Sequence, residues 1–164
     1  MMIETPAAVI ASAIETINTA LKLRAPNTFE YLKVNASAIQ KVQFEGNFDR
    51  AVGELSDKLD AYVKDFSTRI TGVELNALTL DIFNIITGLP PAQTFTYILL
   101  DMPEMWKSQN AIVVKHKMTS YIIYYLAGQY FQDKGLGELA QTHEILARNE
   151  VQDLLSLLHR RTSP

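Results

Sequence analysis

The longest uncharged apolar pattern of the chain lies between residues 111 and 132. From Met118 to Gln132 no residue carries a charge, and four of the seven tyrosines of the chain fall in this range. A helix that is apolar on all sides is typical of one surrounded by other helices or by a neighbouring subunit. The uncharged run is shorter than the roughly 20 residues that a membrane-spanning helix needs. We therefore predict a buried central helix over 111–132 and no transmembrane segment.

Amphipathic periodicity predicts further helices on both sides of this range. Apolar residues three and four apart indicate helices over 5–24 and 136–161, and the second is either one helix or two with a break near Asn149. Over 47–70 a narrow apolar stripe with charged residues behind it predicts an outer helix packed on its own core. The alternative for 47–70 is a short coiled-coil seam with another chain.

Helix start signals and prolines divide the middle of the chain. Thr71 followed three residues later by Glu74 is a capping box, which predicts a helix over 71–88. Pro91 can begin another helix, which we expect over 91–100. Residues 103–110 are then expected to form the first turns leading into the central helix.

Residues 27–46 allow two interpretations. Asn27 and Glu30 resemble a capping box, which would start a short helix ending near Leu32 or Lys33. Apolar and polar residues also alternate here, so that 29–44 could form a small β-hairpin. We favour helix plus loop, because two isolated strands are marginally stable without a partner sheet.

These elements predict an all-α fold in one domain over 1–164, a bundle of about six to seven helices around the central helix. The length is that of one ordinary domain. Seven Gly and six Pro are few and clustered, which favours long regular elements joined by short turns.

Charge and composition exclude several classes of function. A formal net charge of −3 gives no global attraction to nucleic acid or to anionic lipid, so we predict no nucleic-acid partner. The absence of Cys excludes disulfides, thiolate catalysis and Cys-based metal sites. The N-terminus has no basic segment and carries Glu4 beside its apolar part, which argues against a signal peptide. The expected location is the cytoplasm or an assembled particle.

Histidines do not form a metal motif in this sequence. His143-Glu144 begins like the metalloprotease helix motif, but Ala147 occupies the position of the second histidine. No Glu-x-x-His pair of the di-iron bundles occurs either. We interpret His143 as a hydrogen-bonded residue of the core or its rim, and we predict no metal and no cofactor.

The densest positive charge is Lys115-His116-Lys117. Consecutive residues fan around a helix, so these three side chains cannot all face one ligand. We interpret them as a solvated collar where the central helix leaves the core. The alternative is a contact with an anion or an acidic partner, to which Arg160 and Arg161 would contribute further positive charge.

The leading functional hypothesis is a non-enzymatic structural or assembly subunit that works through helix-mediated protein contacts. It is expected to be a homo-oligomer or part of a larger assembly, and small Cys-free helical proteins of this kind occur among particle components and assembly factors of bacterial viruses. Trp, Tyr, Met and Arg are enriched at interfaces. The residues predicted to make contacts are Met102, Met105, Trp106, Tyr124 and Tyr130, with Lys115, Lys117, Arg160 and Arg161 at the rim.

Two other hypotheses compete with this one. The first is a small-ligand-binding domain with an apolar pocket between the central helix and the Leu75–Ile86 helix, where Tyr121, Tyr125 and His143 would supply polar contacts. The second is an enzyme whose acid–base pair meets only in space, formed by Asp81 with His116 or His143.

Overall fold

A computed structural model describes residues 2–35, 37–82, 89–101 and 108–162, with side chains left out of the description at 78–82, 108–110 and 160–162. The elements in chain order are β1 (Met2–Glu4), α1 (Pro6–Arg24), the 3-10 helix η1 (Pro26–Thr28), α2 (Phe29–Leu32), α3 (Ala38–Lys58), β2 (Val63–Thr71), α4 (Gly72–Ile82), β3 (Thr94–Leu100), α5 (Ser108–Asp133) and α6 (Gly137–Thr162). The prediction of a mostly helical protein is confirmed, and the strands correct the expectation that the fold is entirely helical.

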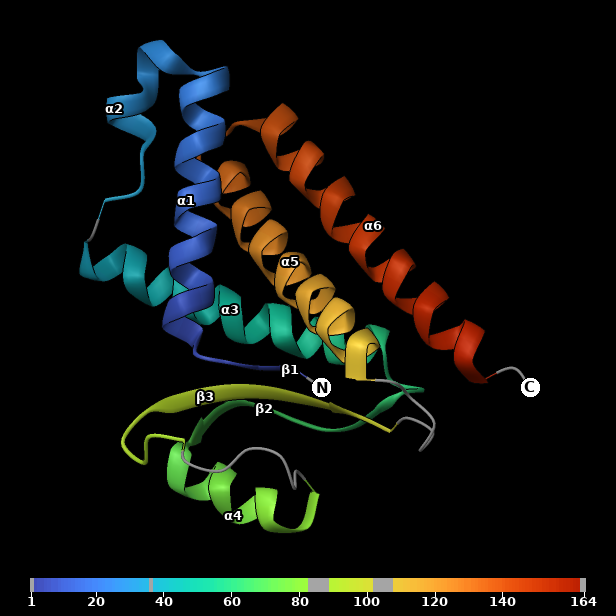
Figure 1. Cartoon of the computed structure of the whole chain (residues 1–164). Coiled ribbons are helices and arrows are strands. Elements are labelled where there is room, and N and C mark those ends of the chain that lie inside the picture. Colours follow the sequence, from blue (N-terminus) through green and yellow to red (C-terminus); the bar gives the residue numbers. More distant parts are fainter. Residues whose placement is uncertain (1, 36, 83–88, 102–107, 163–164) are drawn as a thin grey trace.

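The three strands form one antiparallel sheet between two helical layers. Its order is β1-β3-β2, so the last strand of the chain is the central one. Helices α1, α3 and α5 lie over one face, α6 packs along α5, and α4 covers the opposite face (Figure 1). In the described residues, the fold therefore has a large helical layer, a small sheet and one helix, α4, beneath it.

The predicted helix over 91–100 is wrong, because this segment forms strand β3. Ile98 and Leu100 face the larger core beneath α1, α3 and α5, whereas Phe95, Tyr97 and Leu99 face the smaller core beneath α4. A strand buried on both faces is apolar without alternation, and periodicity cannot tell it from a buried helix. Its aromatic and β-branched content was the signal for a strand.

The predicted helix over 47–70 is confirmed only as far as Lys58 and is wrong beyond it. Helix α3 begins earlier and ends at Lys58, and a turn leads into β2. The apolar spacing continues past this turn by coincidence, since Phe66 is 40 % exposed while Ile70 packs in the smaller core. Backbone pairing with β3 decides the conformation of this segment, and the coiled-coil alternative for 47–70 fails with it.

The β-hairpin over 29–44 is not formed. The short helix of the favoured interpretation is present as α2, and the Ser37 hydroxyl caps α3 by accepting a hydrogen bond from the Gln40 amide at 3.3 Å. The expected capping box of Asn27 is absent from this start. Glu30 instead pairs with Lys33, 2.5 Å away.

Several helix predictions are confirmed. Thr5 caps α1, with Pro6 as its first residue. Thr71 and Glu74 form the reciprocal bonds of a capping box at the start of α4, at 2.9 and 3.2 Å. Helix α6 runs through Asn149 without a break. The predicted end of the helix over 71–88 and the first turns at 103–107 lie outside the described residues.

The turn after α5 sets the direction of α6. Gly135 has a φ of +72°, a left-handed conformation that suits glycine. The Leu136 amide donates to the Phe131 carbonyl at 2.9 Å and the Gly135 amide donates to that of Gln132 at 3.0 Å, as in a Schellman motif. The chain then returns as α6, antiparallel to α5 (Figure 1). Within the described ranges, no helix combines the length and apolarity needed to cross a bilayer.

Candidate functional site: a groove between three helices

An open groove with a volume of about 690 Å³ runs along α5, between α3 and α6. Its floor is α5, one wall is the C-terminal half of α3, and the other wall is α6. Its lining residues are Glu54 and Lys58 from α3; Tyr121, Tyr124, Tyr125, Gly128, Gln129 and Gln132 from α5; and Ala140, Glu144, Ala147, Arg148, Val151, Gln152 and Leu155 from α6. Three of the four tyrosines of the central helix therefore line one depression.

The floor is fixed by a hydrogen bond between two helices. The Tyr125 hydroxyl donates to Oε1 of Glu54 at 2.9 Å, which ties α5 to α3. Burial and this bond to a carboxylate raise the pKa of Tyr125 to about 12. Burial, with the nearby Glu54 charge, raises the pKa of Tyr121 well above its ordinary value. Both tyrosines are held neutral at physiological pH.

Small residues bring α5 and α6 together below the groove. A Cβ on Gly128 would lie 3.7 Å from the Ala140 carbonyl oxygen and 3.8 Å from the Glu144 amide nitrogen. Ala140 and Ala147 add short side chains to the same contact. The concavity therefore comes from short side chains on α6 beside the large rings of α5.

Four charged residues rim the groove. Glu54 and Lys58 lie one helical turn apart on α3, and Glu144 and Arg148 lie one turn apart on α6. Nη2 of Arg148 is 3.7 Å from Oε1 of Glu144, and both side chains are mostly exposed, so this pair contributes little to stability. The two acidic and two basic groups leave the rim without net charge.

His143 lies below the groove, where its interpretation as a hydrogen-bonded core residue is confirmed. Its Nδ1 is 2.8 Å from the Leu139 carbonyl oxygen, which can only accept, so Nδ1 carries the proton. Its ring lies 4.9 Å from that of Phe131 and 6.2 Å from that of Tyr124, between ring centroids. Within the described residues, no three His, Asp or Glu side chains are arranged to hold a metal ion.

The predicted contact residues are dispersed. Tyr124 lines the groove, whereas Tyr130 is buried with its ring stacked 5.9 Å from that of Phe44. The Tyr130 hydroxyl donates to the Leu32 carbonyl at 2.5 Å, so this side chain ties α5 to α2. Met102, Met105 and Trp106 lie outside the described residues. Arg160 and Arg161 belong to the last turn of α6, and their side chains lie outside the described part of the structure.

The two predicted rim lysines form ion pairs within the chain. Nζ of Lys115 is 2.9 Å from Oε1 of Glu4, which ties α5 to β1. Nζ of Lys117 lies 2.7 Å from Asp153 and 3.2 Å from Glu150, which ties α5 to α6 on the side away from the groove. The hydrogen bond to Asp153 is the main cause that raises the pKa of Lys117. The charged collar thus fastens the central helix to its neighbours.

Neither of the other two predicted sites is assembled as expected. The sheet lies between α5 and α4, so the pocket predicted between these helices is not formed (Figure 1). Tyr121 and Tyr125 instead line the groove between α3 and α6. Helix α4, which carries Asp81, lies across the sheet from the helices that carry His116 and His143, so the predicted acid–base pair is not brought together.

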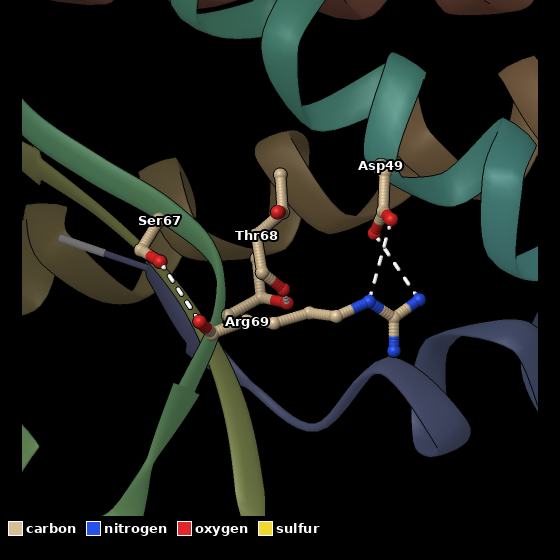
Figure 2. A network of polar contacts seen from close by, with 5 residues as sticks. Asp49, Ser67, Thr68 and Arg69 are labelled. Carbon is tan, nitrogen blue, oxygen red and sulfur yellow. Dashed lines mark hydrogen bonds and ion pairs between the residues drawn. The ribbon is translucent and has the colours of Figure 1, made fainter. Parts of the chain in front are cut away.

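A polar network at the other side of α3 was not predicted. Figure 2 shows Arg69 reaching from β2 to Asp49 on α3, with two nitrogen–oxygen distances of 3.3 Å. Thr68 and Arg69 together oppose the single residue Thr96, so β2 has a β-bulge here, and the bulge changes the direction of the Arg69 side chain. The Ser67 hydroxyl donates to the Arg69 carbonyl at 3.2 Å and supports this turn of the strand. The network holds the groove wall α3 on the sheet.

The α6 wall of the groove was also missed. Ala147 and Val151 belong to the buried stripe of α6, whereas Arg148 and Gln152 sit beside it and are exposed. The sequence signal that was missed is the row of exposed residues on α6 beside its buried stripe; the buried stripe alone was enough to explain how α6 packs.

Comparisons with protein-family models, curated proteins and solved structures find no match to this chain.

Proposed function

We propose that this protein is a non-enzymatic subunit that works through protein contacts and holds an amphipathic helix of its partner in the groove between α3, α5 and α6. The observation that carries the proposal is the groove itself, which is partly open to solvent, floored by tyrosines and rimmed by balanced charges. Tyr and Arg are the residues most enriched at protein contact sites. A helix laid in a groove between helices is a recurring mode of recognition.

The dimensions of the groove fit a helix. Its floor extends from Tyr121 to Gln132, about 17 Å at 1.5 Å per residue. A helix about 10 Å wide that is sunk to half its depth over this length displaces about 670 Å³. This is of the same order as the groove volume of about 690 Å³. The partner helix would complete a layer in which α5 is covered on all sides.

A small organic ligand is the second candidate occupant, because the volume falls in the range of ligand pockets. Such pockets usually bury most of their ligand and offer free polar groups. Here the Tyr125 hydroxyl is already bonded to Glu54, and the groove is open to solvent. These two features favour the helix. Membership of a bacterial-virus particle or its assembly machinery stays a prediction from size and helical content.

Photo-cross-linking tests the proposal. A benzophenone amino acid replaces Gln129 or Gln152 in the groove, with Glu15 on the exposed face of α1 as the matched control position. In the cells that make the protein, irradiation should give one discrete protein adduct from each groove position and none from Glu15. Mass spectrometry of the adduct should map the cross-link to a segment with apolar residues three and four apart. Equal labelling from all three positions, or no protein adduct from the groove, would overturn the proposal.

A further inference from the structure

Helix α6 carries a second periodic stripe that its packing on α5 does not use. The buried stripe is His143, Ala147, Val151, Leu154 and Leu158. The second stripe, which we call the α6 seam, is Gln141, Ile145, Arg148, Gln152, Leu155 and His159. All six seam residues are exposed, and they follow one another at spacings of four, three, four, three and four. Residues at this spacing lie along one side of a helix, and two of the six, Ile145 and Leu155, are apolar.

The seam is continuous with the groove. Arg148, Gln152 and Leu155 belong to the seam and also line the groove wall. A helix that fills the groove would therefore contact the seam at these three positions. Ile145 is 45 % exposed and Leu155 is 36 % exposed, so apolar surface is left for such a contact.

The polarity of the seam reads the same from both ends. From either terminus the order is polar, apolar, polar, polar, apolar, polar. If a second copy of α6 lies antiparallel across it, Ile145 meets Leu155, Arg148 meets Gln152, and Gln141 meets His159. Each of these contacts occurs twice, as in an interface with a two-fold axis. The register places the axis between Arg148 and Gln152.

We propose that the helix bound in the groove is α6 of a second copy of this chain, antiparallel to α6 of the first. The inference rests on the proposed function, because it names the partner of the same groove. By symmetry each copy supplies a groove and inserts its own α6 into the groove of the other. The groove is complete only in the dimer.

The surface available matches what a stable dimer needs. The groove follows α6 from Ala140 to Leu155, about 22 Å at 1.5 Å per residue. Half the surface of a helix about 10 Å wide over this length is about 350 Å². Each copy buries this area on its own α6 and about two thirds of it again on α3 and α5, since the α6 wall is already counted, which gives about 600 Å² per copy, the lower end of the range for stable interfaces.

Charge favours the same arrangement. The seam contains one permanent charge, Arg148, which the register places opposite the neutral Gln152. Arg148 keeps Glu144 of its own helix within 3.7 Å. Two antiparallel copies therefore oppose no like charges at matched positions of the seam. A helix from an unrelated protein would have no reason to mirror this polarity, and this feature favours a second copy.

Disulfide trapping tests the register directly, because the chain has no native Cys. One preparation carries Ile145→Cys and another carries Leu155→Cys, both at exposed positions. After mixing and mild oxidation, the antiparallel dimer predicts that the mixed 145–155 disulfide exceeds either symmetric disulfide by about 10-fold, since only opposed Cβ atoms come within bonding reach. Symmetric 145–145 and 155–155 products in excess would indicate a parallel pair and would overturn the proposal.

Light scattering after size exclusion tests whether the dimer exists without the cross-link. The unmodified protein should be a dimer at tens of micromolar. Ile145→Glu should weaken dimerisation by at least about 100-fold, because the apolar contact is lost at two symmetric places. Ile39→Glu is the matched control, since Ile39 is 74 % exposed on α3 outside the groove, and this variant should remain a dimer.

The two proposals fail in different ways. A monomer at tens of micromolar whose groove positions still cross-link to a helix of another protein overturns the second copy as the partner and leaves the proposed function standing. A monomer without any groove adduct overturns both. A dimer that Ile145→Glu leaves intact overturns the α6 contact.

Discussion

Two glycines in helices of this protein differ sharply in what surrounds them. Gly72 begins α4, and a Cβ added there would lie 2.0 Å from the Pro90 carbonyl oxygen. Gly53 lies inside α3, and beyond its own helix and chain neighbours no described atom comes within 4 Å of a Cβ at that site. The first glycine is required by close backbone approach, whereas the second leaves the helix interior less stable than alanine would.

We predict opposite effects of alanine at these two positions. Gly72→Ala should lower the free energy of unfolding by about 3 kcal/mol or more, because backbone rather than a flexible side chain must move. Gly53→Ala should raise it by about 0.5–1 kcal/mol through helix propensity. Urea unfolding followed by circular dichroism measures both. Equal effects of the two substitutions would contradict the packing at Pro90.

Single side chains also show which sequence interpretations were sound. His143 could be interpreted correctly because it falls on the period of the buried stripe of α6, and a lone histidine there needs only one local acceptor. Tyr130 lies on a helix whose composition gives no inner or outer face. Its bond to Leu32 joins residues far apart in the chain, and no local pattern encodes such a contact.

At the scale of elements, local patterns predicted helices well and strands poorly. Helices α1 and α6 follow from apolar spacing and, for α1, from the Thr5 cap, whereas α5 follows from its long uncharged apolar run. Strand β2 pairs only with β3, and β3 pairs with both β1 and β2, so neither strand can be identified from its own segment alone. In β3 both faces are buried, which removes the alternation that would have distinguished it from a helix.

The hydrogen bond between Tyr125 of α5 and Glu54 of α3 contributes to a fall in the stability of the protein at high pH. The pKa of Tyr125 is raised to about 12 in the folded protein, above its ordinary value of 10. This contribution is complete below pH 10 and is lost as pH rises through about 12, because the unfolded chain ionises first. Tyr125→Phe removes the hydrogen bond to Glu54 and should therefore lower the free energy of unfolding by about 1 kcal/mol at pH 7. Above pH 10, the free energy of unfolding of this variant should depend less on pH than that of the unmodified protein.

Urea unfolding between pH 8 and 11 measures this dependence. Tyr31→Phe is the control, since Tyr31 is 87 % exposed and no hydrogen bond is present for its hydroxyl among the described contacts. Its stability should fall with pH as in the unmodified protein. If Tyr125→Phe falls as steeply, the Tyr125–Glu54 bond does not link the helices in solution.

At the scale of the molecule, the sheet divides the interior into two unequal cores. The larger core joins α1, α3, α5 and α6, and the smaller one includes, among the side chains that the structure describes, Leu75 beneath the sheet residues Ile70, Phe95, Tyr97 and Leu99. A predominantly helical chain was predictable from periodicity, but this division was not, because it depends on β3 having two apolar faces. The groove likewise arises from the relative positions of three helices, which no single helix encodes.

This division predicts that α4 opens separately from the helical layer. The described part of α4 has 11 residues, a length that is marginal for a helix in isolation, and it packs against β2 and β3. Leu75→Ala removes a fully buried side chain of the smaller core and should cost about 2–4 kcal/mol locally. Hydrogen exchange followed by mass spectrometry should then show loss of protection in α4 with little change in α5 and α6.

Ile122→Ala, in the larger core, is the matched control. It should reduce protection throughout the protein, because the helices of the larger core unfold only with the whole molecule. Equal loss in α5 and α4 after Leu75→Ala would mean that the two cores unfold as one cooperative unit.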